Sequence, residues 1–323
     1  MHLIPKKGWR IPRLVKRGVG ACYHVVSRIN GRAFLLRDVE KEAFRDLLRR
    51  VAGFCGVEVL TYAILDNHFH ILLEVPGEVG ELSDEALLER ARLIYGNERK
   101  GQPLSMVRIE LALRAGGEVR TAMRELLIKR MASLPMFVKM LKQRFSILYN
   151  RQHDRVGTLW EGCFHSVLVE STPSALRAVG AYIDLNAVRA GLVDDPKDYR
   201  WSGYGEAAGS KGGFGSYALF RRLKHGHTES VETIAALYRR YLYVSGSNPL
   251  KGGTVSREGL DAVLAKGGAV SAAQLLRCRL RSMTKGALIG SQAFVESWLA
   301  ERARRRRKAA SLSDPEGVQI LFL

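Results

Sequence analysis

The sequence has few cysteines and no long apolar run, and both shortages exclude classes of protein. Its four cysteines are widely spaced and include no C-x-x-C pair: Cys22, Cys55, Cys163 and Cys278. This spacing excludes the usual zinc fingers and gives no reason to expect a disulfide scaffold. No run of about 18 apolar residues spans a membrane, and the basic N-terminus lacks the apolar core of a signal peptide. We therefore expect a cytoplasmic protein that has no membrane partner.

Acidic residues are also scarce relative to basic ones. The chain has 51 Lys and Arg against 32 Asp and Glu, a formal net charge of +19. Residues 211–323 alone hold 19 of the basic and 8 of the acidic side chains. Such an excess favours a polyanionic partner, because each neutralised phosphate releases condensed counterions. Charge alone leaves a ribosome-associated protein, or a basic protein without a particular partner, as alternatives to a nucleic-acid enzyme.

Hydrophobic periodicity predicts an α+β protein. Strands alternate at period two, and helices place apolar residues three and four positions apart. The expected order is strand 21–29, helix 38–54, strand 57–65, strand 68–75, a charged helical insertion at about 77–131, helix 135–151, a strand ending near 170, and helix 174–191. The second and third strands meet at a hairpin turn, Asp66-Asn67. A split β-α-β fold with an antiparallel sheet and helices on one face accounts for this order.

The domain organisation predicted from composition has two parts. The glycine-rich stretch Gly209–Gly215 suggests a boundary or a flexible loop. Residues 1–208 would form the main domain, and 216–323 a basic helical accessory region with helices near 228–243, 255–266, 270–283 and 291–303. The basic run at 302–308 is either a DNA-gripping tail or a solvated helix end.

His68-Phe69-His70 is the most specific local motif. Residues i and i+2 of a strand point to the same side, so the two imidazoles share a face and can hold one divalent cation. Taken alone, an H-x-H pair is more often two polar residues on the solvent-exposed face of a strand. His225-Gly226-His227 is a second such pair, which we interpret as a surface segment. The isolated His24, His153 and His165 we interpret as structural or solvent-facing.

Tyr182 and Asn186 lie four residues apart in the helix predicted at 174–191, so they share one helix face. A tyrosine there is a potential nucleophile if a metal polarises the phosphate, and an Asn side chain offers an oxygen to a hard cation. The alternative is a tyrosine packed at the edge of the apolar stripe of that helix, with its hydroxyl in water.

Four separated segments together resemble one family. They are LTYAILDNHFHILLEVP, KQRFSILYNRQ, VGTLWEGCFHSVLV and YIDLNAVRAGLVDDPKDYRWSGY, in this order. Over about residues 12–205 the chain resembles the single-tyrosine HUH transposases, particularly the REP-associated tyrosine transposases of bacteria.

The resemblance implies a ferredoxin-like HUH domain that cuts single-stranded or hairpin DNA. His68 and His70 match the histidines that hold Mg²⁺ or Mn²⁺, and Asn186 matches the third ligand position. Tyr182 matches the nucleophile, which forms a 5′-phosphotyrosine link and releases a 3′-hydroxyl; Tyr149, in SILYN, is the rival nucleophile. The family commonly has Pro where this chain has Ala187. The resemblance leaves open whether the protein acts as a monomer or a homodimer.

Several basic and aromatic residues are candidate DNA contacts, with a solvated face or a core position as the alternative for each. The candidate phosphate contacts are Lys142, Arg144, Arg155 and Arg189, and the candidate stacking residues are Phe145, Trp160 and Trp201. Two other functions compete with the transposase: a regulator that binds hairpin DNA or RNA without cutting, and a metal-dependent hydrolase that uses water. Neither requires His68, His70 and Tyr182 together.

Overall fold

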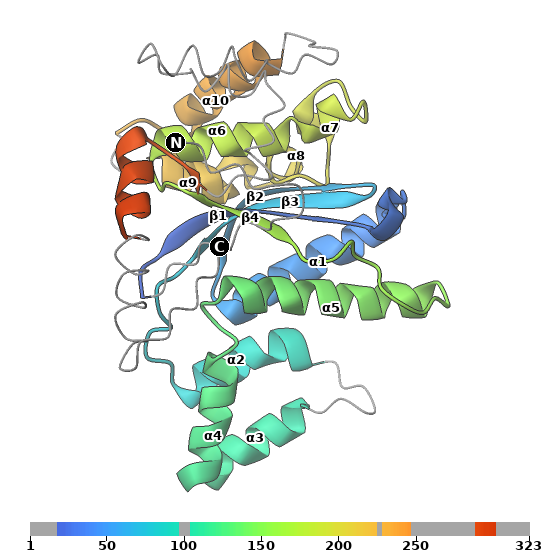
Figure 1. Cartoon of the computed structure of the whole chain (residues 1–323), viewed down its shortest axis with the longest axis vertical. Helices are drawn as coiled ribbons and strands as arrows, with labels where there is room; N and C mark the ends of the chain where they lie inside the picture. Colours follow the sequence, from blue (N-terminus) through green and yellow to red (C-terminus); the bar gives the residue numbers. More distant parts are fainter. Residues whose placement is uncertain (1–17, 97–103, 225–227, 247–287, 302–323) are drawn as a thin grey trace, which may run out of the picture.

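The computed structural model describes residues 18–96, 104–224, 228–246 and 288–301 (Figure 1). Several sequence-based expectations lie outside these residues: most of the N-terminal arm, His225 and His227, the helices near 255–266 and 270–283, and the basic run at 302–308. Within the described part of the chain, no helix is both long and apolar enough to cross a membrane.

One mixed sheet lies at the centre of the described residues, with strand order β2-β3-β1-β4-β5. The strands are β1 (Ala21–Arg28), β2 (Glu58–Leu65), β3 (His68–Val75), β4 (His165–Val169) and β5 (Leu288–Ile289). The first four pair antiparallel, whereas the short β5 runs parallel to β4 and was not expected. The α+β class and the positions of the four longer strands are thus confirmed.

The β2–β3 hairpin turns at Asp66-Asn67 and fixes which side chains share a face. Phe69, Ile71 and Leu73 of β3 enter one hydrophobic cluster, while Leu72 enters a second cluster on the opposite side of the sheet. Because side chains alternate along a strand, His68 and His70 lie on the side of Leu72. This separation of Phe69 from the two imidazoles agrees with the sequence analysis.

Two long helices cover the Phe69 face of the sheet. They are α1 (Asp38–Cys55) and α5 (Leu134–Gln152), which pack against each other beneath the strands in Figure 1. Ser133 caps α5 by accepting from the backbone N–H of Met136, as its sequence predicts. Helix α1 is followed by Gly56, whose φ of 64° is the left-handed conformation that glycine adopts most readily.

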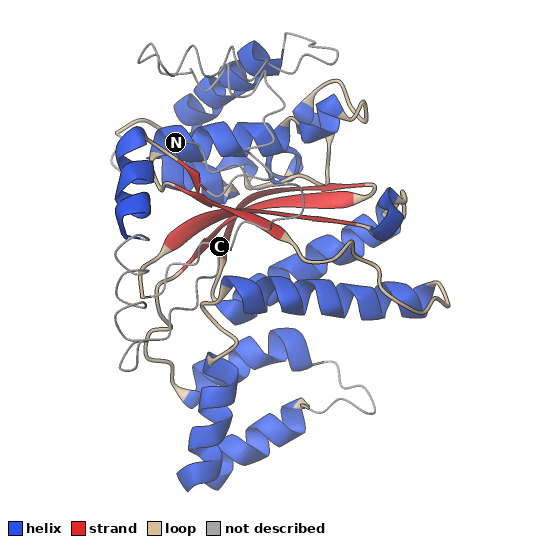
Figure 2. Ribbon diagram, in the orientation of Figure 1, coloured by secondary structure: helices blue, strands red, loops and turns tan. Residues whose placement is uncertain are grey.

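The opposite face is also covered by helices, which corrects the expectation of helices on one face only (Figure 2). These helices are α6 (Pro173–Asp184), α7 (Asn186–Arg189), α8 (Gly203–Gly209), α9 (Ala218–Lys224) and α10 (Val231–Gly246). The helix expected over 174–191 is interrupted at Leu185, so Tyr182 lies in the last turn of one helix and Asn186 begins the next. Gly191 takes the left-handed φ of 70° expected of a residue that follows a helix.

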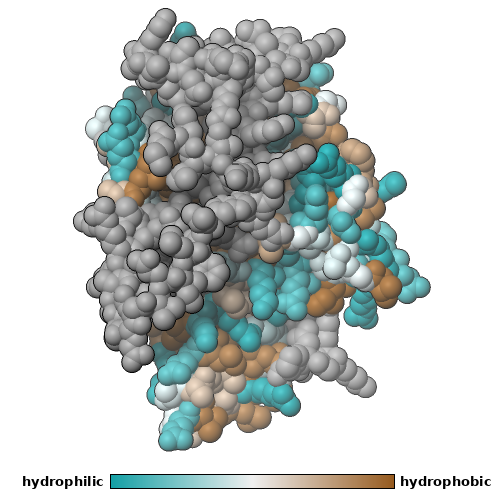
Figure 3. Space-filling model, viewed as in Figure 1, coloured by the Kyte–Doolittle hydropathy of each residue, from teal (hydrophilic) through white to brown (hydrophobic). Residues whose placement is uncertain are grey.

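The expected insertion is helical and forms the lower end of the molecule in Figure 1. It consists of α2 (Asp84–Tyr95), α3 (Met106–Ala115) and α4 (Gly117–Ile128). Leu87, Ile94 and Leu127 join it to the hydrophobic cluster of α1 and α5. Its surface shows both hydrophobic and hydrophilic patches in Figure 3. Val107, Leu111 and Val119 are among its exposed apolar residues.

The glycine-rich stretch does not separate the core from the helices on its C-terminal side. A short 3-10 helix, η3 (Gly213–Ser216), leads directly into α9. Leu219 and Phe220 of α9 and Tyr238 of α10 belong to the same hydrophobic cluster as Leu60 and Leu72 of the sheet. The chain beyond residue 216 therefore begins with two helices that complete the core.

Candidate metal and nucleophile site

His68 and His70 meet on the α6 side of the sheet, with ring centroids 5.0 Å apart. His70 is buried and His68 is partly exposed. Burial lowers the pKa of His68 to about 4, with the charge of Arg28 acting in the same direction. The pKa of His70 is lowered too, first by burial and then by the charges of neighbouring residues. Both imidazoles are therefore neutral near pH 7, which is the form that binds metals.

A third histidine completes this cluster and was missed by the sequence analysis. His24 of β1 is fully buried, and its Nε2 atom lies 3.0 Å from Nδ1 of His70. The two rings are stacked with centroids 5.2 Å apart. In the sequence His24 alternates with apolar residues like any polar residue of a half-buried strand, so only its pairing with β3 reveals it.

Tyr182 approaches the same cluster from α6. Its ring centroid lies 5.8 Å from that of His70 and 5.9 Å from that of His24, edge-on in both cases. The helix thus places the aromatic ring beside the imidazoles, although the whole helical insertion and α5 lie between His70 and Tyr182 in the sequence. The tyrosine side chain is partly exposed.

Asn186 and Arg189 both hold the carbonyl of Tyr182. The Asn186 Nδ2 atom donates to this oxygen at 2.8 Å, and Arg189 Nη1 donates to it at 3.1 Å. The Arg189 guanidinium also lies 5.2 Å from the centre of the Tyr182 ring. The i, i+4 relation of Tyr182 and Asn186 thus survives the break at Leu185, and Arg189 is placed beside the tyrosine.

A divalent cation would find part of a ligand set here. Two neutral imidazoles share a face, and the Asn186 side chain keeps its Oδ1 atom for a hard cation because Nδ2 is engaged. The described residues contain no group of three His, Cys, Asp or Glu side chains placed to hold a metal. A metal bound by the two imidazoles could take its other ligands from water and, as the resemblance to the transposases implies, from the Asn186 oxygen.

A buried carboxylate anchors the helix that carries Tyr182. Asp184 is fully buried and accepts from Thr61 Oγ1 at 2.8 Å, Tyr217 OH at 2.8 Å and Tyr238 OH at 2.6 Å. The donors come from β2, from the residue before α9, and from α10. Burial raises the pKa of Asp184 to about 6, against the opposing effect of these three hydrogen bonds.

The rival nucleophile lies on the other side of the sheet. Tyr149 of α5 is buried in the cluster that contains Phe69, and its ring stacks on His153 at a centroid distance of 4.3 Å. The strands therefore stand between Tyr149 and the imidazoles.

Lys142 and Trp160 lie on the α5 side and contact each other. Trp160 donates its indole N–H to the Lys142 carbonyl, and Lys142 Nζ donates to the Gly162 carbonyl. Trp160 and Phe145 are buried among Phe44 and other core residues, which leaves neither ring open for stacking on a base. Their aromatic side chains fill the space between α1, α5 and the sheet, a packing demand that the sequence alone does not reveal.

Arg144 and Arg155 have different surroundings. Arg144 lies 5.1 Å from the centre of the Tyr95 ring, and burial lowers its pKa, with Arg50 and Arg130 as positively charged neighbours. Arg155 is near Tyr149, and its Nη1 atom is buried without a hydrogen-bond partner within the described residues. Trp201, the third proposed stacking residue, is contacted by Lys41 and Arg200.

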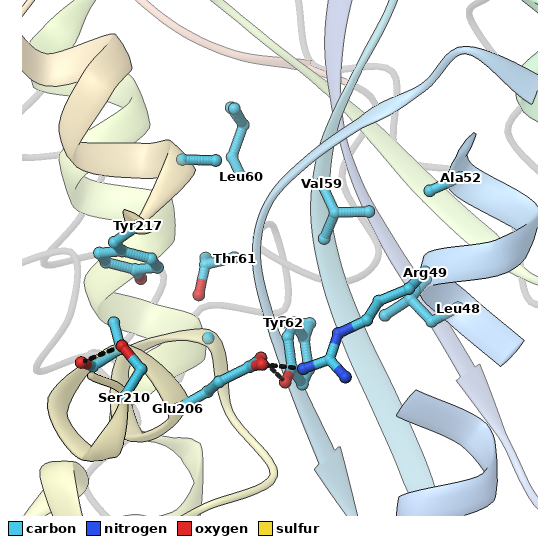
Figure 4. A pocket seen from close by; sticks show the side chains of 13 residues that line it. Leu48, Arg49, Ala52, Val59, Leu60, Thr61, Tyr62, Glu206, Ser210 and Tyr217 are labelled. Atoms are coloured by element: carbon cyan, nitrogen blue, oxygen red, sulfur yellow. Dashed lines mark hydrogen bonds and ion pairs between the residues drawn. The ribbon is translucent and has the colours of Figure 1, made fainter. Parts of the chain in front are cut away.

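A separate cavity of about 380 Å³ opens between α1, β2 and α8. Figure 4 shows Glu206 in this cavity, contacting both Arg49 and the Tyr62 hydroxyl. Thr61 and Tyr217, which line the cavity, also hold Asp184. None of His68, His70 and Tyr182 lines it, so the cavity is distinct from the candidate site.

The fold and the site define an α+β protein that brings two strand histidines and a helix tyrosine together. Residues 19–82, which contain β1, α1 and the HFH motif, match the family model described as "Transposase IS200 like". The comparisons thereby confirm the resemblance to this class of transposase. Among solved structures, the chain is similar to a REP-associated tyrosine transposase bound to a REP hairpin, with 13% identity, a TM-score of 0.39, and coverage of 63% of this chain and 86% of that one. A comparison with curated protein sequences finds no match.

Proposed function

We propose that this protein is a metal-dependent DNA endonuclease and strand transferase that uses Tyr182 as its nucleophile. The observation that carries the proposal is the convergence of the Tyr182 ring on His70 and His24, with His68 beside them. The family match of residues 19–82, which covers the two HFH histidines, supports the same assignment.

In the proposed reaction, the Tyr182 hydroxyl oxygen attacks the phosphorus of one phosphodiester. The bond from phosphorus to the 3′-oxygen breaks, which leaves the 5′-phosphate on the tyrosine and a free 3′-hydroxyl. The tyrosine loses a proton and the leaving oxygen gains one, so the step consumes no other reactant. Attack by a 3′-hydroxyl on the phosphotyrosine would reverse the bonds and rejoin DNA without ATP.

His68, His70 and Asn186 would hold Mg²⁺ or Mn²⁺, which supplies positive charge to the phosphate oxygens when it is bound. Arg189 supports the same electrostatic role from the protein side, because its guanidinium lies against the Tyr182 ring. The neutral form that burial gives to both imidazoles leaves their nitrogen lone pairs available to the cation.

The proposed substrate is single-stranded or hairpin DNA, which the sequence motifs imply. Tyr182 is partly buried against the sheet, so a phosphate must reach it without the bulk of a continuous duplex. The net charge of +19 favours binding of the DNA backbone. We place this activity in the cytoplasm.

A covalent-adduct assay tests the proposal. The protein is incubated with Mn²⁺ and labelled hairpin DNAs, and denaturing gels are run beside Tyr182→Phe, Tyr149→Phe and His68→Ala variants. We expect a labelled protein band that is lost in Tyr182→Phe and His68→Ala and kept in Tyr149→Phe. Loss of the labelled band in Tyr149→Phe alone would identify Tyr149 as the nucleophile. Tight binding without an adduct across a library of hairpins would favour the non-cutting regulator. Metal-dependent cleavage without an adduct would favour the hydrolase.

A further inference from the structure

The Nδ1 atoms of His68 and His70 are both engaged by neighbouring side chains. His68 Nδ1 lies 2.6 Å from the Oδ1 atom of Asn67, and His70 Nδ1 lies 3.0 Å from Nε2 of His24. A histidine ring binds a metal through one nitrogen, and the hydrogen bond made by the other nitrogen fixes which one it is.

The proton position on His68 follows from the Asn67 amide. Asn67 Nδ2 donates to the Arg32 carbonyl at 3.0 Å, so the other amide atom, Oδ1, faces His68 as an acceptor. His68 Nδ1 must then be the donor and carry the proton. Its Nε2 atom is left with a lone pair, which is the form that a metal ligand requires.

The proton position on His70 is coupled to that of His24. If His24 donates from Nε2, His70 accepts at Nδ1 and a neutral His70 carries its proton on Nε2, where it blocks a metal. If His24 accepts, His70 carries the proton on Nδ1 and its Nε2 is open. The pair is buried and close, so only one of these two arrangements is present in any one molecule.

We propose that Asn67 and His24 are positioning residues that hold the Nδ1–H groups of His68 and His70 and so present both Nε2 atoms to one divalent cation. This inference rests on the proposed function, because it concerns the same metal. It assigns a role to a turn residue and to a buried β1 histidine that contact the ligands and not the cation. Outer partners of this kind typically change metal affinity by about 10- to 100-fold when they are removed.

The test is Mn²⁺ binding to the full chain, measured by electron paramagnetic resonance without DNA. The variants His24→Leu and Asn67→Leu each remove the side-chain atom that accepts from an Nδ1–H group. His24→Gln keeps an acceptor oxygen near the place of Nε2, and Asn67→Asp keeps Oδ1. His153→Leu is the control, because His153 contacts Glu40 and Tyr149 on the opposite face. Thermal unfolding of each variant shows whether it folds. If His24→Leu does not fold, Asn67→Leu and His24→Gln still test the proposal.

We expect both leucine variants to bind Mn²⁺ at least about tenfold more weakly than the wild type, with the Gln and Asp variants restored to within about threefold. We also expect histidine ¹⁵N spectra with Mg²⁺ to show His68 and His70 protonated on Nδ1. Unchanged Mn²⁺ affinity in the folded leucine variants, or a proton on Nε2 in the Mg²⁺ form, would overturn the positioning role.

The two proposals fail differently. One outcome is that the wild type forms the DNA adduct and binds Mn²⁺ while the folded leucine variants bind Mn²⁺ equally well. That result contradicts the positioning role alone. Weakened Mn²⁺ binding in the leucine variants without any adduct in the wild type contradicts the cleavage mechanism alone. A wild-type protein that binds no Mn²⁺ contradicts both.

Discussion

Arg189 makes two contacts with the proposed nucleophile, one to its carbonyl and one to its ring. An arginine side chain carries its N–H donors in one plane, a geometry that matches two oxygens of a phosphate. Lysine offers a charge of the same sign without this planar geometry. The position of Arg189 therefore suggests a contribution to transition-state charge as well as to DNA binding.

Replacing Arg189 by Ala should lower the single-turnover rate of adduct formation by about 10²-fold, the usual effect of removing one preorganised donor. Arg189→Lys should recover only a small part of the rate because an ammonium group lacks the planar set of N–H donors. The measurement is a single-turnover time course at saturating DNA. Arg177→Ala serves as the matched control, since Arg177 lies on the same helix as Tyr182 and contacts Tyr241. Equal rates in Arg189→Ala and Arg177→Ala would show that Arg189 has no special part in the reaction.

The chemistry-bearing residues differ in how far sequence predicts them. His68, His70 and Tyr182 stand in recognisable motifs, and the structure brings them together. His24 belongs to no such motif, since its contact with His70 depends on strand pairing that places β1 beside β3. Trp160 shows the opposite case, a residue that the sequence wrongly suggests as a DNA contact. An aromatic residue near basic ones resembles a base-stacking position until its burial is known.

Helix α6 is held in place by one ionisable group, Asp184. Three hydroxyl groups from three other segments donate to it, so the carboxylate ties the helix that carries Tyr182 to the sheet and to α10. Its raised pKa has a consequence for stability. The folded state binds the proton more tightly than an unfolded chain with the usual pKa of 3.8. The contribution of Asp184 to the free energy of unfolding is therefore full below about pH 4 and falls as the pH rises to about 6.

This dependence can be measured by comparing the wild type with Asp184→Asn, which does not titrate. From pH 4 to pH 7 the free energy of unfolding of the wild type should fall, relative to the variant, by about 2–3 kcal/mol. Urea unfolding at a series of pH values gives this difference. Parallel pH profiles for the two proteins would show that the pKa of Asp184 is not raised.

The elements themselves were largely predictable, but their layering was not. Period-two and helical patterns located β1 to β3, α1 and α5 within one or two residues. The sheet was expected to have one helical face because the order of the elements matched a split β-α-β fold. His24 of β1 is nevertheless buried, because its side of the sheet is covered by the α6 layer instead of water. Ser27 is buried on the opposite side, where it pairs with Phe69. The break at Leu185 was missed because no proline or glycine stands between Ala181 and Ala190 to mark the end of a helix.

Across the whole molecule, charge is the property most directly linked to DNA. Arg144 is half-buried beside Tyr95, and the positive charges of Arg50 and Arg130 act on it. Repulsion among these three positive charges is reduced when a phosphate or a carboxylate binds beside them. Arg144 therefore stays a predicted DNA contact on the side of the molecule opposite to Tyr182.

A salt titration of DNA binding tests this prediction. The logarithm of the affinity for single-stranded DNA should fall with the logarithm of salt concentration, and each phosphate contact contributes about −0.7 to the slope. Arg144→Gln should bring the slope about 0.7 closer to zero. Arg221→Gln should leave it unchanged, because Arg221 pairs with Glu58. Fluorescence anisotropy at several salt concentrations provides the slopes, and an unaltered slope in Arg144→Gln would remove this residue from the DNA interface.

The partners of Asp184 also limit how such a protein can be shortened or recombined. The glycine-rich stretch Gly209–Gly215 looks like a convenient place to trim the chain or to graft the C-terminal part of a relative. A cut there would remove Tyr217 and Tyr238, two of the three hydroxyl donors of a carboxylate buried two residues after Tyr182. The smallest functional unit of this chain therefore extends through α10, and any exchange of C-terminal parts must carry both tyrosines with it.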